Sequence, residues 1–250
     1  MEKLKLFPPA SLQLEVGIQT LKPEIAKNIS RRINVEKIFK NISFLENETN
    51  THLHFDLIIG LPGESLESFG ENLNTLMKLT DAEIQIGILK KLSGTDLYRH
   101  DEKYGMVYSD SPPYEILQND LISFSEMQKM KRLARFWDLY YNSGNFRTSI
   151  KLIWNESDVY SSFFEFSEWV YKNTSSTWQI SLNRLAELLF KYLAEMKKYD
   201  KQNIADLLVQ DIFVFAGRRL PNFLRAVASN IPDLDKKVIS RSNKRQIKHN

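Results

Sequence analysis

Three polar side chains in the first quarter of the chain have the types needed to hold a small zwitterion that carries sugar hydroxyls. Gln19 lies near the end of LQLEVGIQT, Asp56 lies in FDLIIGLPGES, and Arg31 lies in the segment between them. A guanidinium suits the carboxylate of an amino acid, whereas a carboxylate and an amide suit an ammonium group or ribose hydroxyls. Two alternatives stay open, namely a solvated helix-end arginine at Arg31 and a buried carboxylate that fixes backbone amides at Asp56.

Two glycines mark the turn that follows Asp56. Gly60 ends a predicted strand, and Gly63 lies in the turn before a predicted helix. Glycine lets a ligand approach the backbone, and a helix N-terminus favours an anionic or polar group. The pattern is weak by itself, because it is neither a dinucleotide-binding G-x-G-x-x-G nor a P-loop.

The chain contains no cysteine, which excludes disulfides, thiolate nucleophiles and iron–sulfur ligation by its own residues. His52 and His54 share one face of a predicted strand, but the sequence offers no evident third ligand, so we predict no metal site. Glu15, Asp56 and Glu83 could act as paired acid–base carboxylates, but no aromatic sugar cleft accompanies them. We therefore assign no catalytic residue.

The elements that must position these residues alternate between strands and helices. Strict alternation of apolar and polar residues predicts strands at residues 12–20, 51–60 and 83–88. Helical spacing predicts a helix over residues 65–79, and Asn34 is placed to cap a helix before the second strand. Helical crossovers of this length join parallel neighbours with a right-handed connection.

Each predicted strand has one apolar row and one polar or small row. Strands buried on both faces read as continuous apolar runs, and these do not. The polar rows fit a barrel lumen that holds a polar ligand near the carboxyl ends of the strands, while a solvated face on a plain sheet is the alternative. We therefore predict the α/β class, with a partial, half TIM-like parallel barrel of βα units followed by an all-α C-terminal domain.

The expected organisation has three parts. Residues 1–112 form the half-barrel, residues 113–235 form the helical domain, and residues 236–250 form a basic, disordered tail. A long connection begins at Ser93, and helical spacing then predicts further helices, at residues 115–141, 146–154, 159–173, 180–198 and 203–217. The dense aromatic residues of this part favour core packing over an aromatic cofactor box.

Composition and charge indicate an ordinary globular protein. The net charge is +3, and 42% of the residues are hydrophobic. The sequence has neither a long apolar run nor an apolar signal-peptide core near its start, so we expect a cytoplasmic protein without membrane contact. The basic tail favours a solvated terminus over nucleic-acid binding.

Four segments in order carry a family resemblance, namely LEVGIQT, the pair Arg31–Arg32, FDLIIGLPGES and EIQIGILKKLSGT. They resemble the fourth, fifth and sixth strands of the radical S-adenosylmethionine (SAM) barrel. The chain looks closest to the cobalamin-binding-type enzymes once labelled anaerobic magnesium-protoporphyrin IX monomethyl ester oxidative cyclases, and more distantly resembles oxygen-independent coproporphyrinogen oxidases. SPPYE and the helical remainder are similar to a C-terminal domain of unknown function found on some of the cobalamin-type proteins.

The resemblance implies a set of S-adenosylmethionine contacts in this chain. These contacts are Gln19, Arg31, Asp56, Gly60, Leu89 and Lys90. By resemblance, Asp56 would meet the ribose, Gly60 would lie where the adenine approaches, and the backbone of Leu89 and Lys90 would reach that base. Arg32 would replace Arg31 after a small shift in the alignment.

The chain departs from the family because it lacks the C-x-x-x-C-x-x-C loop that ligates a [4Fe–4S] cluster. We expect it to be the C-terminal portion of a radical SAM enzyme, with the cluster and any cobalamin held by the full-length parent. The parent would catalyse a radical methylation, cyclisation or rearrangement, tetrapyrrole-related by resemblance, and this chain would not be competent alone. The alternative is a non-catalytic binding or scaffold protein on a degenerate half-barrel.

The first strand, residues 12–20, lacks a neighbour on one side, which leaves backbone donors and acceptors open. We expect the N-terminal barrel half and the cobalamin-type domain of the parent as partners. In the isolated chain, we expect either a homodimer through this edge or coverage of the edge by the segment MEKLKLFPPAS.

Overall fold

The chain divides into two compact units, Met1–Ala134 with Asp158–Ser161, and Arg135–Ser157 with Ser162–Asn250. The computed structural model describes residues 2–155 and 157–231, so the predicted tail at 236–250 lies outside the described residues. The two units are defined by compactness and do not test where separately folding domains begin and end. The domain boundaries expected after residues 112 and 235 therefore remain predictions. No helix within the described ranges is long and apolar enough to cross a membrane.

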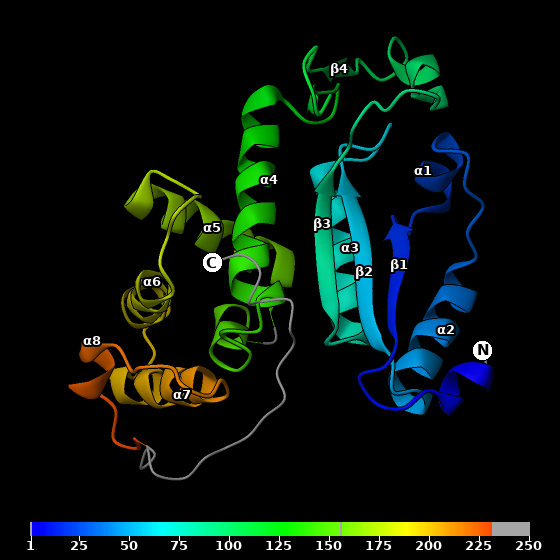
Figure 1. Ribbon diagram of the computed structural model, residues 1–250. Coiled ribbons are helices and arrows are strands. Elements are labelled where there is room, and N and C mark those ends of the chain that lie inside the picture. The colour runs from blue at the N-terminus through cyan, green and yellow to red at the C-terminus, as the bar shows by residue number, and fades with distance from the viewer. Residues whose placement is uncertain (1, 156, 232–250) are drawn as a thin grey trace. The chain divides into compact units, whose positions relative to one another are not determined.

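A parallel three-stranded sheet forms the centre of the first unit (Figure 1). Its strands lie in the order β1 (Gln13–Gln19), β2 (His52–Ile59) and β3 (Glu83–Ile88). The helices between them are α1 (Pro23–Asn28), α2 (Val35–Glu48) and α3 (Leu66–Leu79). The predicted strands, their parallel pairing and the α/β class are therefore confirmed. The closed curvature of a half-barrel remains a prediction.

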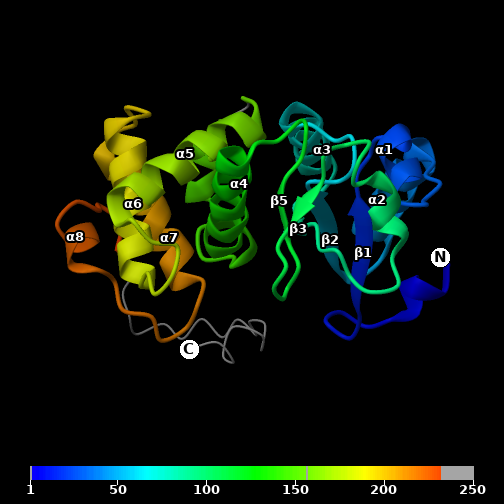
Figure 2. The same ribbon diagram turned by 90° about the horizontal axis from the view of Figure 1, so that it is seen from above.

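The apolar rows of the strands pack under the helices, as their alternation predicts. Phe55, Leu57 and Ile59 of β2 are fully buried, and so are the α3 residues Leu73 and Leu76. Seen from above, α3 lies on one face of the sheet (Figure 2). The opposite face carries the polar rows, and there Glu15 and Gln85 are exposed to solvent. A half-buried sheet of this kind explains why the strands alternate.

Capping residues set the helix starts that the sequence predicts. Asn34 accepts a hydrogen bond from the backbone N–H of Lys37 at 2.8 Å, and Pro23 occupies the first position of α1. Ser65 caps α3 through the N–H of Ser68. Each contact satisfies a backbone donor that the helix itself leaves open.

The connection after β3 corrects one prediction. The helix predicted over residues 115–141 begins only at Phe124, where α4 (Phe124–Trp137) starts. Before it, β4 (Val107–Tyr108) pairs antiparallel with β5 (Ile116–Gln118), and the 3₁₀ turn η2 (Asp96–His100) precedes both. Residues 114–116 add antiparallel contacts to residues 89–91, and these non-local contacts override the local helical spacing.

Helices make up the second unit among its described residues. It begins with the end of α4. The helical elements that follow along the chain are η3 (Asp138–Asn142), η4 (Ser149–Ile153), most of α5 (Val159–Thr174), α6 (Leu182–Glu195), α7 (Lys201–Phe213) and α8 (Asn222–Arg225). Aromatic rings pack edge to face in its core, with ring centroids 4.9 Å apart for Tyr140 and Phe166 and 4.8 Å apart for Phe166 and Tyr192. The rings are fully buried, which agrees with core packing.

The outer edge of β1 has no strand beside it within the described residues. The N-terminal segment folds as η1 (Glu2–Leu6) and contacts α2 instead, through an ion pair of 2.5 Å between Lys5 and Glu48. Lys5 also lies over the ring of Phe44, 4.9 Å from its centroid. The segment does not pair with β1 as a strand among the described residues, and coverage of the edge by this segment and dimerisation through the edge both remain predictions.

Candidate functional site

Gln19 and Arg31 meet over Gly17 near the carboxyl end of β1. A Cβ atom added at Gly17 would lie 3.2 Å from Nε2 of Gln19 and 3.7 Å from both terminal nitrogens of Arg31. The pairing register shifts between Gly17 and Gln19, and Gln19 has a φ of 66°. A bulge of this kind re-aims a side chain, and a left-handed non-glycine residue is strained. The structure thus brings two predicted residues together through a local distortion of the strand.

Arg31 also binds the open edge of β1. Its Nη1 donates a hydrogen bond of 2.7 Å to the Gly17 carbonyl. The N–H of His52 donates to the Leu12 carbonyl, so alternate residues from Leu12 onward face β2 and Gly17 faces the opposite edge. Arg31 therefore satisfies one acceptor of the edge while its guanidinium stays exposed.

Asp56 is the register partner of Gly17 on β1 and of Gln85 on β3. Asp56 therefore lies on the polar face of the sheet, in the same cross-strand row as Gly17, the glycine over which Gln19 and Arg31 meet. Burial, together with the negative charge of Glu15, raises the pKa of Asp56 above its ordinary value, and His54 opposes this shift. The row opposite the apolar face thus holds a partly buried carboxylate on β2 and, around the paired Gly17 on β1, a guanidinium and an amide.

A buried hydrogen-bond network ties the end of β1 to the turn after β2. Oε1 of Glu64 accepts from the Thr20 hydroxyl at 2.8 Å and from Nδ2 of Asn72 at 2.9 Å. Oδ1 of Asn72 accepts from the N–H of Leu21 at 3.2 Å. Thr20, Glu64 and Asn72 are all buried. The network fixes the strand end that carries Gln19 relative to the turn LPGES.

Glu64 is a functional candidate that sequence reasoning missed. Burial raises its pKa to about 8, although the bonds from Thr20 and Asn72 oppose the shift. Its Oε2 atom is buried and forms no hydrogen bond with the described residues. The only local signal in the sequence was an acidic residue directly before the helix cap Ser65. Acidic residues are common at helix N-termini, where they interact favourably with the helix dipole, so this position did not indicate a buried carboxylate.

The connection after β3 covers the turn between β2 and α3. Nδ2 of Asn28 donates to the Pro62 carbonyl at 2.7 Å and lies 3.1 Å from the hydroxyl of Tyr104. Nε2 of His100 lies 2.6 Å from the Asn28 carbonyl. Gly63 has a φ of 83°, and a Cβ there would lie 3.0 Å from the Tyr104 ring. The glycine thus allows the connection to pack directly on the turn.

The structure places the other three predicted contacts around the end of β3. A Cβ at Gly60 would lie 2.8 Å from Ile116 and 3.2 Å from Met127, so protein atoms already occupy that side of the glycine. The N–H of Leu89 donates to Ile59, and its carbonyl accepts from Ile116. Among the described residues, the N–H and carbonyl of Lys90 form no backbone hydrogen bond. The backbone donor and acceptor of Lys90 are therefore not used by other backbone groups of the described residues.

The connection after β3 forms a cavity of about 440 Å³, lined in part by Lys91, Asp101 and Tyr108. Nζ of Lys91 forms an ion pair of 2.5 Å with Asp101 and lies over the Tyr108 ring. Burial, with a smaller contribution from Asp101, raises the pKa of the Tyr108 hydroxyl to about 12. The cavity therefore combines a neutral hydroxyl with a charge pair.

Comparison with known proteins places most of the chain in one family. Residues 102–249 match the family described as protein of unknown function (DUF4080). The chain belongs to the DUF4080 family. It is also similar to the oxygen-independent coproporphyrinogen-III oxidase-like protein HemZ of Bacillus subtilis (strain 168), with 26% identity over 92 residues. That match covers 37% of this chain and 18% of HemZ, so the chain spans a small part of the relative's length.

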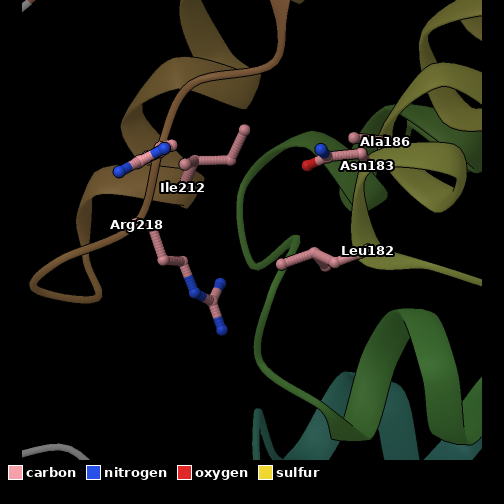
Figure 3. Close-up of a pocket in the computed structure, with 6 residues that line it drawn as sticks. Leu182, Asn183, Ala186, Ile212 and Arg218 are labelled. Carbon is pink, nitrogen blue, oxygen red and sulfur yellow. The ribbon is translucent and has the colours of Figure 1, made fainter.

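The DUF4080 segment includes a second cavity, in the helical unit (Figure 3). Its volume is about 200 Å³, and α6, α7 and the segment after α7 line it. Arg218 donates to Oδ1 of Asn145 at 2.7 Å and lies 3.8 Å from the centroid of the Phe215 ring. Burial lowers the pKa of Arg218. Nη2 of the guanidinium is therefore held by Asn145, whereas its Nη1 is buried and has no hydrogen-bond partner among the described residues.

Proposed function

We propose that this chain is the C-terminal portion of a radical SAM enzyme and that its sheet supplies half of the S-adenosylmethionine pocket. The observation that carries the proposal is the meeting of Gln19 and Arg31 over Gly17, in register with Asp56. The similarity to a coproporphyrinogen-III oxidase-like protein also supports the proposal that the chain is part of a radical SAM enzyme. Ligands of parallel α/β folds bind at the carboxyl ends of the strands, where Gln19 lies.

The side chains present fit the polar groups of S-adenosylmethionine. Arg31 keeps a terminal nitrogen beyond the one that binds Gly17, and it would hold the amino-acid carboxylate. Asp56 would accept from ribose hydroxyls, and Gln19 would bind either the ammonium group or a hydroxyl. The unused backbone groups of Lys90 suit the edge of an adenine ring. The cofactor would supply the radical chemistry, and these residues would bind and orient it.

The residues of this chain do not fit an iron–sulfur cluster. A [4Fe–4S] cluster is ligated by cysteine thiolates, and the sequence has no cysteine. We therefore assign no step of the reaction to this chain, and we expect no reductive cleavage of S-adenosylmethionine after iron–sulfur reconstitution of the 250-residue polypeptide. Cleavage at a rate above the background would contradict that expectation.

The substrate and further cofactors of the parent follow only from resemblance. We propose that the parent catalyses a radical methylation, cyclisation or rearrangement that is tetrapyrrole-related by resemblance only, with cobalamin as a further cofactor of the parent. The cavity beside Lys91 and Tyr108 would then belong to the substrate side of the site. The competing function is a non-catalytic binding or scaffold protein on the same fold, which the absence of cysteine favours.

Calorimetric titration with S-adenosylhomocysteine tests the proposal. Arg31→Gln should reduce the affinity at least tenfold, because it removes the guanidinium that faces the site. Arg32→Gln is the matched control, since Arg32 is equally exposed and adjacent in the chain, and it should leave the affinity unchanged. If the unmodified chain does not bind at millimolar ligand, or if the two variants bind equally, the proposed pocket is wrong and the scaffold function is favoured.

A further inference from the structure

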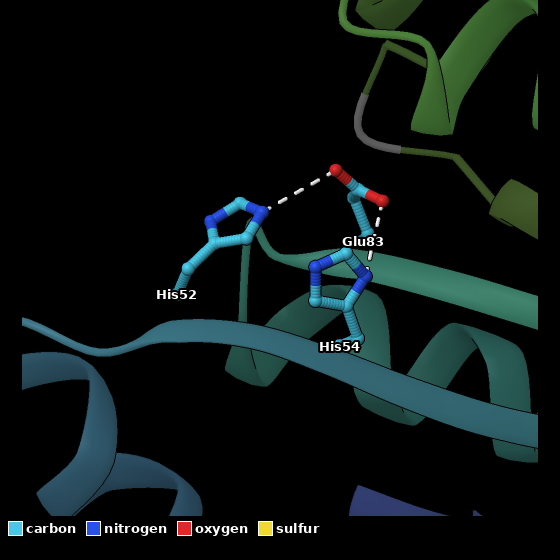
Figure 4. Close-up of side chains that lie close together, drawn as sticks. All are labelled: His52, His54 and Glu83. Atoms are coloured by element: carbon cyan, nitrogen blue, oxygen red, sulfur yellow. Dashed lines mark ion pairs between the residues drawn. The ribbon is translucent and has the colours of Figure 1, made fainter. Parts of the chain in front are cut away.

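A second cluster of ligand-type side chains lies on the polar face, at the amino ends of β2 and β3 (Figure 4). His52 and His54 lie two residues apart on β2 and therefore point to the same face. Glu83 opens β3 and is the register partner of His54. Sequence reasoning named Glu83 as a possible acid–base carboxylate but did not predict it as a third ligand for the two histidines, because only the strand register brings it to them.

The carboxylate of Glu83 directs one oxygen toward each of the two imidazole rings (Figure 4). Its Oε1 is 3.5 Å from Nε2 of His52, and its Oε2 is 3.1 Å from Nδ1 of His54. The rings meet edge to face, with centroids 4.6 Å apart. One ligand atom from each residue lies within 4.8 Å of the others. Two nitrogens and one oxygen therefore converge on one small volume.

We propose that His52, His54 and Glu83 bind a divalent transition-metal ion of the zinc type. Zinc–nitrogen bonds of about 2.1 Å in tetrahedral geometry place neighbouring ligand atoms roughly 3.4 Å apart. The separations of 3.1 and 3.5 Å are close to this spacing and end on the two different oxygens of Glu83. One ligand atom from each residue lies within 4.8 Å of the others, and rotation of the half-exposed His52 side chain would bring the three to the spacing that zinc requires.

The donor set selects the class of metal. Two imidazole nitrogens and one carboxylate oxygen suit zinc and similar first-row ions, whereas calcium and magnesium prefer oxygen ligands alone. Glu15 on β1 is the other register partner of His54 and adds negative charge beside the site. Three protein ligands leave a fourth position for water.

The site would link the amino ends of β2 and β3. A bound ion stabilises the folded chain because its ligands are far apart in the unfolded state. The alternative is a metal-free cluster, in which protonated histidines form ion pairs with Glu83. The metal-free cluster predicts that added zinc does not change the melting temperature. One experiment therefore distinguishes the zinc site from the metal-free cluster.

Zinc titration of tag-free protein at pH 7.5, by calorimetry and by thermal unfolding, tests the proposal. The unmodified chain should bind one equivalent of Zn²⁺, and Co²⁺ should give the intense visible absorption of a low-coordinate site. His52→Gln and Glu83→Gln should weaken zinc binding at least tenfold and abolish the rise in melting temperature. His249→Gln and Glu36→Gln are the matched controls, and both should bind zinc like the unmodified chain.

Two results would overturn the proposal. One is a chain that does not bind zinc at micromolar concentrations, which would leave the ion-pair cluster as the account of these contacts. The other is unchanged zinc affinity in both His52→Gln and Glu83→Gln, which would place the bound zinc elsewhere. Both variants change partly exposed side chains, and their melting temperatures without zinc show whether each has folded.

Discussion

Arg31 donates a 2.7 Å hydrogen bond to the carbonyl of Gly17, and its guanidinium occupies the space beside the missing side chain of that glycine. One contact thus serves two purposes. It satisfies an acceptor on the open edge of β1, and it holds a positive charge next to Gln19 on the face where we place the cofactor. The glycine is what allows both side chains to lie there.

Gly17→Ala should therefore weaken ligand binding more than it changes stability. The new Cβ would lie 3.2 Å from Nε2 of Gln19, closer than ordinary van der Waals contact, so Gln19 must move. We expect at least a tenfold loss of S-adenosylhomocysteine affinity, or about 1.4 kcal/mol, measured by calorimetry. Gly87→Ala is the control, because its nearest neighbour would be 3.7 Å away. Equal effects of the two substitutions would refute this role for Gly17.

Glu64 should make stability depend on pH. Its pKa is about 8 in the folded chain against 4.5 ordinarily, so the folded state keeps a proton that the unfolded state releases between these values. The free energy of unfolding should therefore fall as pH rises from about 4.5 to about 8, by at most on the order of 5 kcal/mol.

Glu64→Gln should remove this contribution, because an amide does not ionise. Denaturant unfolding at pH 5 and pH 8.5 should show the variant close to the unmodified chain at pH 5 and more stable at pH 8.5. The exposed Glu36→Gln serves as control and should follow the unmodified chain at both values. A Glu64→Gln chain that loses stability equally at both pH values would contradict the assigned pKa.

Thr20→Val should destabilise the first unit. It keeps the shape of the side chain but removes the hydroxyl that donates to Glu64 and accepts from Asn72 and the N–H of Lys22. Leaving such buried groups without a partner costs about 1–3 kcal/mol. Thr75→Val is the comparison, since that hydroxyl bonds only to the carbonyl of Glu71 in its own helix. Equal unfolding midpoints for both variants would show that the network does not contribute.

Asp211→Ala should destabilise the helical unit. The buried carboxylate accepts from the N–H groups of Thr148 and Ser149 and from the Ser149 hydroxyl. Its loss leaves two buried donors of Ser149 and the partly buried N–H of Thr148 without their acceptor, at a cost of roughly 3 kcal/mol. Asp206→Ala on the same helix is the control, because Asp206 makes a similar set of bonds to Ser229 and Asn230 while exposed. Chemical denaturation should show a clearly smaller effect for the control.

Local patterns in the sequence predicted the sheet well. Strict alternation located β1, β2 and β3, and the cap at Asn34 and the proline at Pro23 marked helix starts that the structure confirms. These features depend on neighbours within a few residues. The candidate residues Gln19, Arg31 and Asp56 were also identifiable, because Gln19 and Asp56 lie in the polar rows of the predicted strands and Arg31 lies in the connection between those strands.

Non-local contacts account for what the sequence did not reveal. The start of α4 was misplaced because the pairing of β5 with β4 decides the structure of residues 116–118. Glu64 was missed because its partner Thr20 is 44 residues away. Glu83 was not predicted as a third ligand because the strand register, and no local pattern, places it beside His54. Each depends on contacts that no window of local sequence contains.

The most direct test of the proposed cofactor pocket is a crystal structure of this chain grown with saturating S-adenosylhomocysteine. We predict ligand density on the polar face at the carboxyl ends of β1 and β2, with its carboxylate at Arg31 and its ribose at Asp56. Density elsewhere, such as in the cavity beside Arg218, or a polar face without ligand at saturation, would contradict the proposed function.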